Sequence, residues 1–236
     1  MPKSRKFVLI ICEGPTDENA LYRIMKGFFS PCEIRFHISH GDPLTSCPEN
    51  KNPMSVIRAI VAQEKKKYAL RDSDILAVIQ ITDTDGAYIP PECVIDDPEA
   101  SKIIYNRTEI RTKFPHSILS RNVKKRINIS KLLEYKGINE EIPYRIYYVS
   151  RNLEHAFYGI QDNLTDNRKS NLADDFSDRF AKDWRRFLSY IMKECNPIGS
   201  SYDESWSLIK NGTSSLERHT NMNFLFEEFS YILYKD

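Results

Sequence analysis

Apolar runs and amphipathic segments alternate through the first half of the chain. Residues 7–12 are a continuous apolar run, and 74–82 and 144–149 are largely apolar; such segments are typical of strands buried on both faces of a parallel sheet, and 33–38 is a further strand candidate. Between these runs, helical spacing of apolar residues predicts one helix after an N-cap at Thr16 and another over 53–67. The order strand, helix, strand, helix, strand predicts an α/β fold with a mostly parallel sheet flanked by helices.

Helical spacing dominates the last third of the chain. Phe176, Phe180, Trp184 and Phe187 recur at intervals of three or four residues, which predicts one long amphipathic helix over 174–195. Further helices are predicted over 201–210 and 221–234, and a polar stretch without periodicity covers 163–171. We therefore divide the chain into an α/β domain, residues 1–162, and a helical C-terminal region, residues 163–236. A loop within one domain is equally compatible with the polar stretch.

Composition fits a folded globular protein. Of 236 residues, 41% are hydrophobic and 11% aromatic, which excludes a disordered chain. The first apolar run is far too short for a signal peptide or a membrane span, and the five cysteines contain no C-x-x-C pair. We expect a cytoplasmic protein. The formal net charge of +1 predicts no partner, so the distribution of charge matters more.

Acidic residues follow two of the apolar runs. Glu13 comes directly after the first run, and Asp83 and Asp85 end the run that begins at residue 74. The carboxyl ends of parallel strands form one edge of a sheet, so these side chains should converge there. Converging carboxylates repel one another unless a cation neutralises them, and all-oxygen ligands suit Mg²⁺ or Mn²⁺. The sequence predicts a metal site.

The two acidic motifs resemble those of the Toprim domain. Glu13-Gly14-Pro15-Thr16-Asp17 after an apolar strand, and a later strand ending in Asp-x-Asp, are similar to its two motifs over roughly residues 7–155. Topoisomerases, bacterial primases, a small ribonuclease that matures ribosomal RNA and OLD-type nucleases of phage defence share this domain. The resemblance implies a Toprim-like (Rossmann-like) sheet with a centre of two Mg²⁺ or Mn²⁺ ions, held by Glu13, Asp83 and Asp85. It also implies that these acids are catalytic, with Glu13 as a general acid or base.

The first motif is most similar to OLD-type defence nucleases. That resemblance adds Asp17 and Glu154 as metal ligands. It implies a Mg²⁺-dependent endonuclease that hydrolyses DNA or RNA as a bacterial phage-defence effector, with an ATPase encoded separately, since the chain has no Walker A motif. Each added acid has a simpler interpretation: Asp17 in a first helical turn is favoured by the helix dipole, and Glu154 can cap a helix.

Positive charge gathers in an insertion at about residues 100–136. Between residues 102 and 136 there are ten Lys or Arg and only two acids, with Tyr105 and Phe114 interleaved. Such a segment suits contact with a phosphate backbone, and its aromatic rings suit stacking on bases. A solvated insertion or a docking surface for an acidic partner is the alternative. The candidate nucleic-acid-binding residues are Arg107, Arg111, Lys113, Arg121, Lys124, Lys125 and Arg126.

Two other functions compete with the nuclease. One is a ribonuclease that processes structured RNA, although the first motif and the spacing to Asp83 differ from those of the small Toprim ribonuclease. The other is a non-catalytic adaptor on a Toprim scaffold that binds nucleic acid or protein. The presence of Glu13, Asp83 and Asp85 argues against the adaptor.

Overall fold

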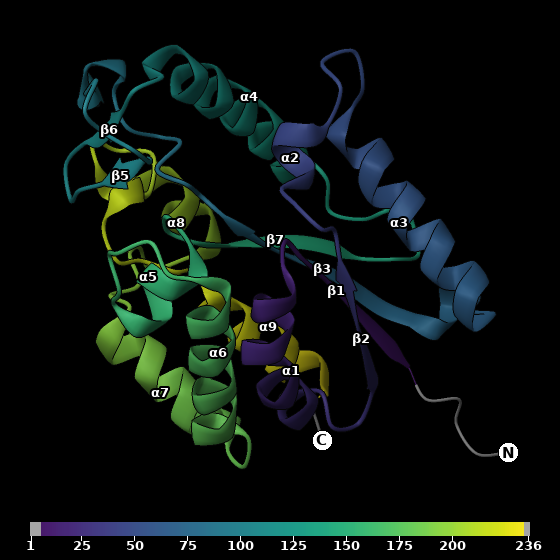
Figure 1. Cartoon of the computed structure of the whole chain (residues 1–236). Helices are drawn as coiled ribbons and strands as arrows, with labels where there is room; N and C mark the ends of the chain where they lie inside the picture. Colours follow the sequence, from purple (N-terminus) through teal and green to yellow (C-terminus); the bar gives the residue numbers. More distant parts are fainter. Residues whose placement is uncertain (1–5, 234–236) are drawn as a thin grey trace, which may run out of the picture.

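Four parallel strands form the central sheet of the protein. A computed structural model describes residues 6–233, and the strand order in the sheet is β2-β1-β3-β7 (Figure 1). The predicted α/β fold with a mostly parallel sheet is confirmed. The strand predicted over 74–82 begins and ends one residue later in the structure, and the other three strands match their predicted ranges. The strands are β1 (Phe7–Cys12), β2 (Glu33–Ile38), β3 (Ile75–Asp83) and β7 (Tyr144–Val149).

One face of the sheet is covered by helices from both ends of the chain (Figure 1). Val8 and Ile10 of β1 point into this core, where they meet the rings of Phe28, Phe187 and Phe226. Burial of such side chains is the main stabilising term of the fold. The helices on this face are α1 (Pro15–Phe28), α5 (Leu153–Tyr158), α6 (Asp166–Phe180), α7 (Trp184–Glu194) and α9 (Met222–Leu233).

The opposite face has a separate apolar core. Leu9 and Ile11 alternate with the residues that face the first core, and they pack here with Ile57, Ile129 and Trp206. The alternation explains why the strand is apolar throughout, since both of its faces are buried. The helices on this face are α2 (Pro43–Ser46), α3 (Pro53–Tyr68), α4 (Pro115–Leu133) and α8 (Tyr202–Leu208).

The expected long helix over 174–195 is wrong, because the segment forms two helices. The chain turns at 181–183, and the Asp183 side chain accepts a hydrogen bond from the Arg185 amide (3.0 Å), which caps α7. Phe180 and Phe187 lie on either side of the turn with ring centroids 5.7 Å apart. Both helices thereby share the core of the sheet. The last residue of the helix predicted over 221–234, Tyr234, lies outside the described residues.

The start of α1 also differs from the prediction. Gly14, rather than Thr16, is the N-cap, and Pro15 takes the first helical position, where its fixed φ is favourable. The Asp17 carboxylate accepts a hydrogen bond from the Gly14 amide (2.8 Å). This hydrogen bond fixes the turn that directly follows Glu13.

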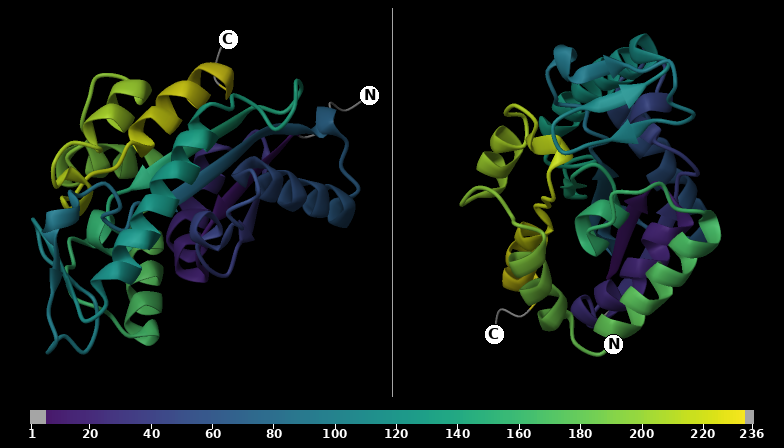
Figure 2. Two further views of the ribbon diagram at one scale, coloured as in Figure 1. Left: turned by 90° about the horizontal axis from the view of Figure 1, so that it is seen from above. Right: turned by 60° about the vertical axis from the view of Figure 1, so that its left-hand side comes forward.

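The basic insertion folds into strands and a helix. A three-stranded sheet in the order β4-β6-β5 packs with the start of α4 around Ile110 and Ile118, and the two lie together at one end of the molecule (Figure 2). Among the described residues, no helix is both long enough and apolar enough to cross a membrane. The remaining elements are η1 (Asp72–Asp74), η2 (Pro91–Cys93), β4 (Val94–Asp96), β5 (Ile104–Tyr105), β6 (Ile110–Thr112) and η3 (Ser214–Leu216).

Candidate metal centre

Every strand of the central sheet is followed by at least one acidic residue at its carboxyl end. The chain leaves β1 for α1 on one face of the sheet and enters α4, after β3, on the other face. Ligand sites of α/β sheets form where successive connections diverge in this way. The acids at this edge are Glu13 after β1, Asp42 after β2, Asp83 and Asp85 at the end of β3, and Glu154 after β7.

Three of these acids form a compact cluster, here named the acid triad. Glu13, Asp42 and Asp85 each offer a carboxylate oxygen, and these oxygens lie within 4.8 Å of one another. The Lys125 ammonium lies among them, with its Nζ 2.5 Å from Asp85 Oδ2, 3.0 Å from Asp42 Oδ2 and 3.7 Å from Glu13 Oε1. The Lys125 side chain is 0% exposed. The triad could bind a metal ion.

Glu13 is fixed by the end of β3. Its Oε1 accepts hydrogen bonds from Thr82 Oγ1 (2.9 Å) and from the Asp83 amide (3.1 Å). Burial raises the pKa of Glu13 to about 7, with a further upward contribution from Asp42 that is opposed by Lys125. Glu13 can therefore exchange a proton near neutral pH.

Asp42 is brought to the triad by the loop after β2. The amides of Ser39 and Gly41 donate to the carbonyls of Cys12 (3.0 Å) and Glu13 (3.2 Å), which ties the loop to the end of β1. Asp42 Oδ1 caps α2 by accepting from the Leu44 amide (2.8 Å). Its buried Oδ2 contacts the Lys125 ammonium at 3.0 Å. One oxygen is thus structural, and the other is directed at the cation position.

The sequence interpretation missed Asp42. The signal was present, because Gly41-Asp42-Pro43 is an acidic turn shortly after a predicted parallel strand. The rule that selected Glu13 and Asp85 applies to it equally.

Asp85 reaches the triad through a strained turn. β3 ends at Asp83, and Asp85 has a φ of +50°, in the left-handed region that Asp tolerates better than most residues. Its amide donates to the carbonyl of Arg151 (2.8 Å), which has a φ of +59°. Such conformations cluster at functional sites. The turn directs the Asp85 carboxylate into the triad, whereas the Asp83 carboxylate is not a member of it.

The ionisation of the two β3 acids differs. Burial raises the pKa of Asp85, but Lys125 and Arg121 outweigh burial and hold that pKa below its ordinary value. Asp83 has its pKa raised well above the ordinary value by burial and by the neighbouring charges of Glu13 and Asp17. Asp83 thus interacts with the triad member Glu13 and with the further acid Asp17.

Asp17 and Glu154 lie on the other side of this edge. Burial raises the pKa of Asp17 to about 6, and the negative charge of Glu154 adds to the rise. Glu154 Oε1 lies 3.1 Å from Lys169 Nζ of α6. The structure therefore brings Asp17 and Glu154 near each other but not into the triad, and their assignment as metal ligands stays a prediction.

The basic segment has an inner pair of residues on α4. Arg121 and Lys125 are one helical turn apart, and Arg121 Nη2 donates to the carbonyl of Asp85 (2.7 Å). We expected Lys125 on a nucleic-acid-binding surface, but the structure buries it. A buried ammonium needs compensating acids, which the triad supplies. The Tyr105 ring lies against the guanidinium groups of Arg121 and Arg151, at 6.0 and 4.8 Å.

The other basic residues lie away from the triad. Arg107 pairs with Glu217 (3.6 Å) and Arg111 with Glu109 (2.6 Å). Phe114, at the start of α4, is 67% exposed. The remaining predicted contacts are the exposed Lys113 and the half-buried Lys124 and Arg126.

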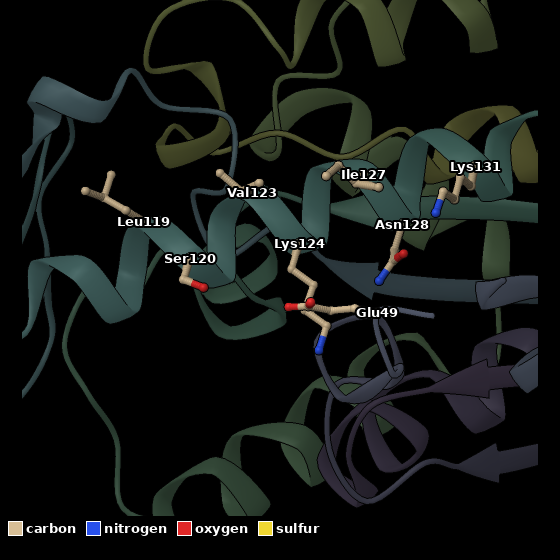
Figure 3. Close-up of a pocket in the computed structure, with 8 residues that line it drawn as sticks. All are labelled: Glu49, Leu119, Ser120, Val123, Lys124, Ile127, Asn128 and Lys131. Carbon is tan, nitrogen blue, oxygen red and sulfur yellow. The ribbon is translucent and has the colours of Figure 1, made fainter. Parts of the chain in front are cut away.

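A groove of about 510 Å³ runs along the outer side of α4 (Figure 3). The exposed side chains of Val123 and Ile127 lie in it beside Lys124. The outer side of α4 is therefore both apolar and basic, whereas Lys125 points into the protein. The groove is also lined by Glu49, Leu119, Ser120, Asn128 and Lys131.

Comparisons of the chain with protein-family models, with curated proteins and with solved structures found no match. The chain has an α/β fold with a parallel sheet and a half-buried acid triad that could bind a metal ion.

Proposed function

We propose that the chain is a metal-dependent nuclease that hydrolyses phosphodiester bonds of DNA or RNA with Mg²⁺ or Mn²⁺. The observation that carries this proposal is the convergence of Glu13, Asp42 and Asp85 on one cation position at the carboxyl edge of the sheet. This is the edge at which ligands of parallel α/β sheets bind.

The donor atoms of the triad fit a hard divalent cation. All of them are carboxylate oxygens, which Mg²⁺ and Mn²⁺ prefer. The buried Asp42 Oδ2 points to the same position as the other two acids and contacts the Lys125 ammonium there at 3.0 Å. A second ion is proposed near Asp83, with Asp17 and Glu154 as further ligands. The resemblance of the Glu13 and Asp83 motifs to the Toprim domain supports this set.

The residues of the centre suit hydrolysis of a phosphodiester. A bound metal ion would polarise the phosphate and lower the pKa of a coordinated water. Glu13, whose pKa burial raises to about 7 in the metal-free protein, is a ligand of the triad, and the resemblance to the Toprim domain implies a further role as general acid or base. The Arg121 guanidinium, next to Asp85, adds positive charge beside the triad. On the outer surface, Lys113, Lys124 and Arg126 are the proposed contacts for a nucleic-acid backbone.

The biological setting follows only from the resemblance to OLD-type nucleases. We propose a phage-defence effector that works with a separately encoded ATPase. A variant of this proposal is that the same centre processes structured RNA. Comparing cleavage of tRNA with cleavage of DNA tests this variant.

A non-catalytic adaptor is the second candidate function. The observation that favours it is the Lys125 ammonium, which compensates the acid triad without any metal ion. In that case the triad and Lys125 are a permanent structural ion-pair network, and only the surface of α4 binds a partner.

Cleavage assays separate the two candidates. The purified chain is incubated with plasmid DNA, single-stranded DNA and tRNA in the presence of Mg²⁺, Mn²⁺ or EDTA. We expect metal-dependent cleavage by the wild type and by the control Asp96→Asn, whose carboxylate is exposed in β4. Glu13→Gln and Asp85→Asn should each reduce the rate on the order of 100-fold or more. Equal cleavage by all variants, or no cleavage by a wild type that binds metal in calorimetry, would reject the nuclease.

A further inference from the structure

The Lys125 ammonium occupies the position to which the three acids of the triad point. Its Nζ lies between 2.5 and 3.7 Å from an oxygen of each acid, and its side chain is 0% exposed. An ammonium without water is stabilised only where acids surround it. Lys125 is therefore held in place by the same oxygens that would bind a metal ion.

We infer that Lys125 is an internal counter-ion that a divalent metal ion must displace from the acid triad. This inference rests on the proposed function. A bound Mg²⁺ contacts its oxygen ligands at about 2.1 Å. The triad oxygens span at most 4.8 Å, so an ion bound to all three stands where the ammonium now stands. Two cations in that space repel strongly at low dielectric.

The ion pairs of Lys125 have two consequences. They remove the repulsion among the three carboxylates, so the metal-free protein keeps the triad assembled. They also compete with the metal ion, so the affinity of the triad for metal is lower than its ligands alone would give. Metal binding is thereby coupled to release of a lysine on α4.

A Lys125 that supports metal binding, rather than competing with it, would give the opposite effect when it is replaced. If Lys125 only positioned the carboxylates and stayed in place beside the metal, its loss would weaken metal binding. Lys169 offers a contrast at the same edge, because among the described residues it forms an ion pair with Glu154 only and its side chain is 34% exposed. Its ammonium is therefore partly in contact with solvent, whereas that of Lys125 is not.

Calorimetric titration of the metal-free chain with Mn²⁺ distinguishes these roles. For Lys125→Met we expect a Kd at least about tenfold lower than that of the wild type, because the competing cation is absent. The matched control is Lys131→Met, which removes a lysine of the same helix at the groove, outside the triad, and should leave the Kd unchanged. An unchanged or higher Kd for Lys125→Met overturns the inference.

Thermal unfolding supplies the second measurement. In EDTA, Lys125→Met should unfold at a lower temperature than the wild type, and saturating Mn²⁺ should raise its Tm by more than it raises that of the wild type. If Lys125→Met does not fold without metal, Lys125→Gln is folded with Mn²⁺ and its Kd is measured by competition with a chelator, with the same expectation. A wild type that binds Mn²⁺ while neither variant binds more tightly refutes this inference alone. No binding by any variant rejects the proposed function as well.

Discussion

The pKa values of two carboxyl groups in the acid triad depend on their burial and on the charges next to them. Glu13 has a pKa of about 7 and Asp85 a pKa below its ordinary value, although both lie within reach of the same ammonium. Lys125 Nζ is closer to Asp85 (2.5 Å) than to Glu13 (3.7 Å), and Arg121 also lowers the pKa of Asp85. Of these two acids of the triad, Glu13 is therefore the one whose protonation should change near neutral pH.

The stability of the metal-free protein should decrease as Glu13 ionises. The pKa of Glu13 is raised from an ordinary 4.5 to about 7, so the folded state binds this proton more tightly than the unfolded chain does. Its contribution to stability is complete below 4.5 and is lost as the pH rises through 7. Urea unfolding in EDTA should show a loss on the order of 1–3 kcal/mol over this range, and Glu13→Gln should flatten the profile. If the stability of the wild type and that of Glu13→Gln changed with pH in the same way, the raised pKa of Glu13 would be contradicted.

Asp42 should matter for metal binding as much as the acids of the two sequence motifs do. Asp42→Asn keeps the side-chain oxygen that caps α2 but removes the negative charge from the triad. We expect Mn²⁺ affinity to fall at least about tenfold, since two carboxylates remain. Calorimetry on this variant and on Asp96→Asn measures the difference, and equal affinities would exclude Asp42 as a ligand.

The sequence predicted Glu13 and Asp85 at one edge of the sheet, where the structure brings them together. It did not predict Asp42, because the loop after β2 carries the acid four residues beyond the strand. It assigned Lys125 to the surface, because a charge count cannot show which lysine of a basic helix points inward.

Helices and strands of this chain differ in how clearly the sequence marks them. The four strands of the central sheet were predicted within one residue. β1 and β3 are largely buried on both faces, which leaves a mostly apolar run, whereas the short strands β4, β5 and β6 were not predicted. The break between α6 and α7 was missed. Phe180, Trp184 and Phe187 keep helical spacing across the turn, and only the capping contact of Asp183 reveals it.

The packing of α7 on the sheet should depend on Phe187. This ring is fully buried and contacts Phe157, Phe176 and Phe226. Phe187→Ala should lower the free energy of unfolding by about 3–5 kcal/mol, through lost burial and the cavity left behind. Met192→Ala is the control on the same helix, since Met192 is 53% exposed. Similar urea midpoints for the two variants would show that α7 does not share the core.

Across the whole molecule, acidic and basic groups meet at one edge of the sheet. The carboxyl ends of β1 and β3 lie beside α4, which directs Lys125 toward the acids and Lys124 toward the outer groove (Figures 1 and 3). The parallel order of the strands was predictable from their sequence pattern. The sequence pattern did not predict that α4 has one side facing the acids and another facing the groove. This arrangement depends on how the helix packs on the apolar core on that face of the sheet.

Nucleic-acid binding should weaken with salt in proportion to the basic residues used. If Lys113 and Lys124 contact phosphates, replacing either by Ala should reduce the slope of log affinity against log salt by about one unit. Binding is measured in EDTA to prevent cleavage, with Lys193→Ala of α7 as the control on another helix. Slopes that match the wild type would place the nucleic acid elsewhere.

We propose that the acid triad binds a divalent metal ion. Anomalous diffraction from crystals grown with saturating Mn²⁺ tests it most directly. We expect an anomalous peak in contact with the carboxylates of Glu13, Asp42 and Asp85, with the Lys125 ammonium moved away from them. Absence of a peak at the triad, with Lys125 still between the three carboxylates, would contradict it.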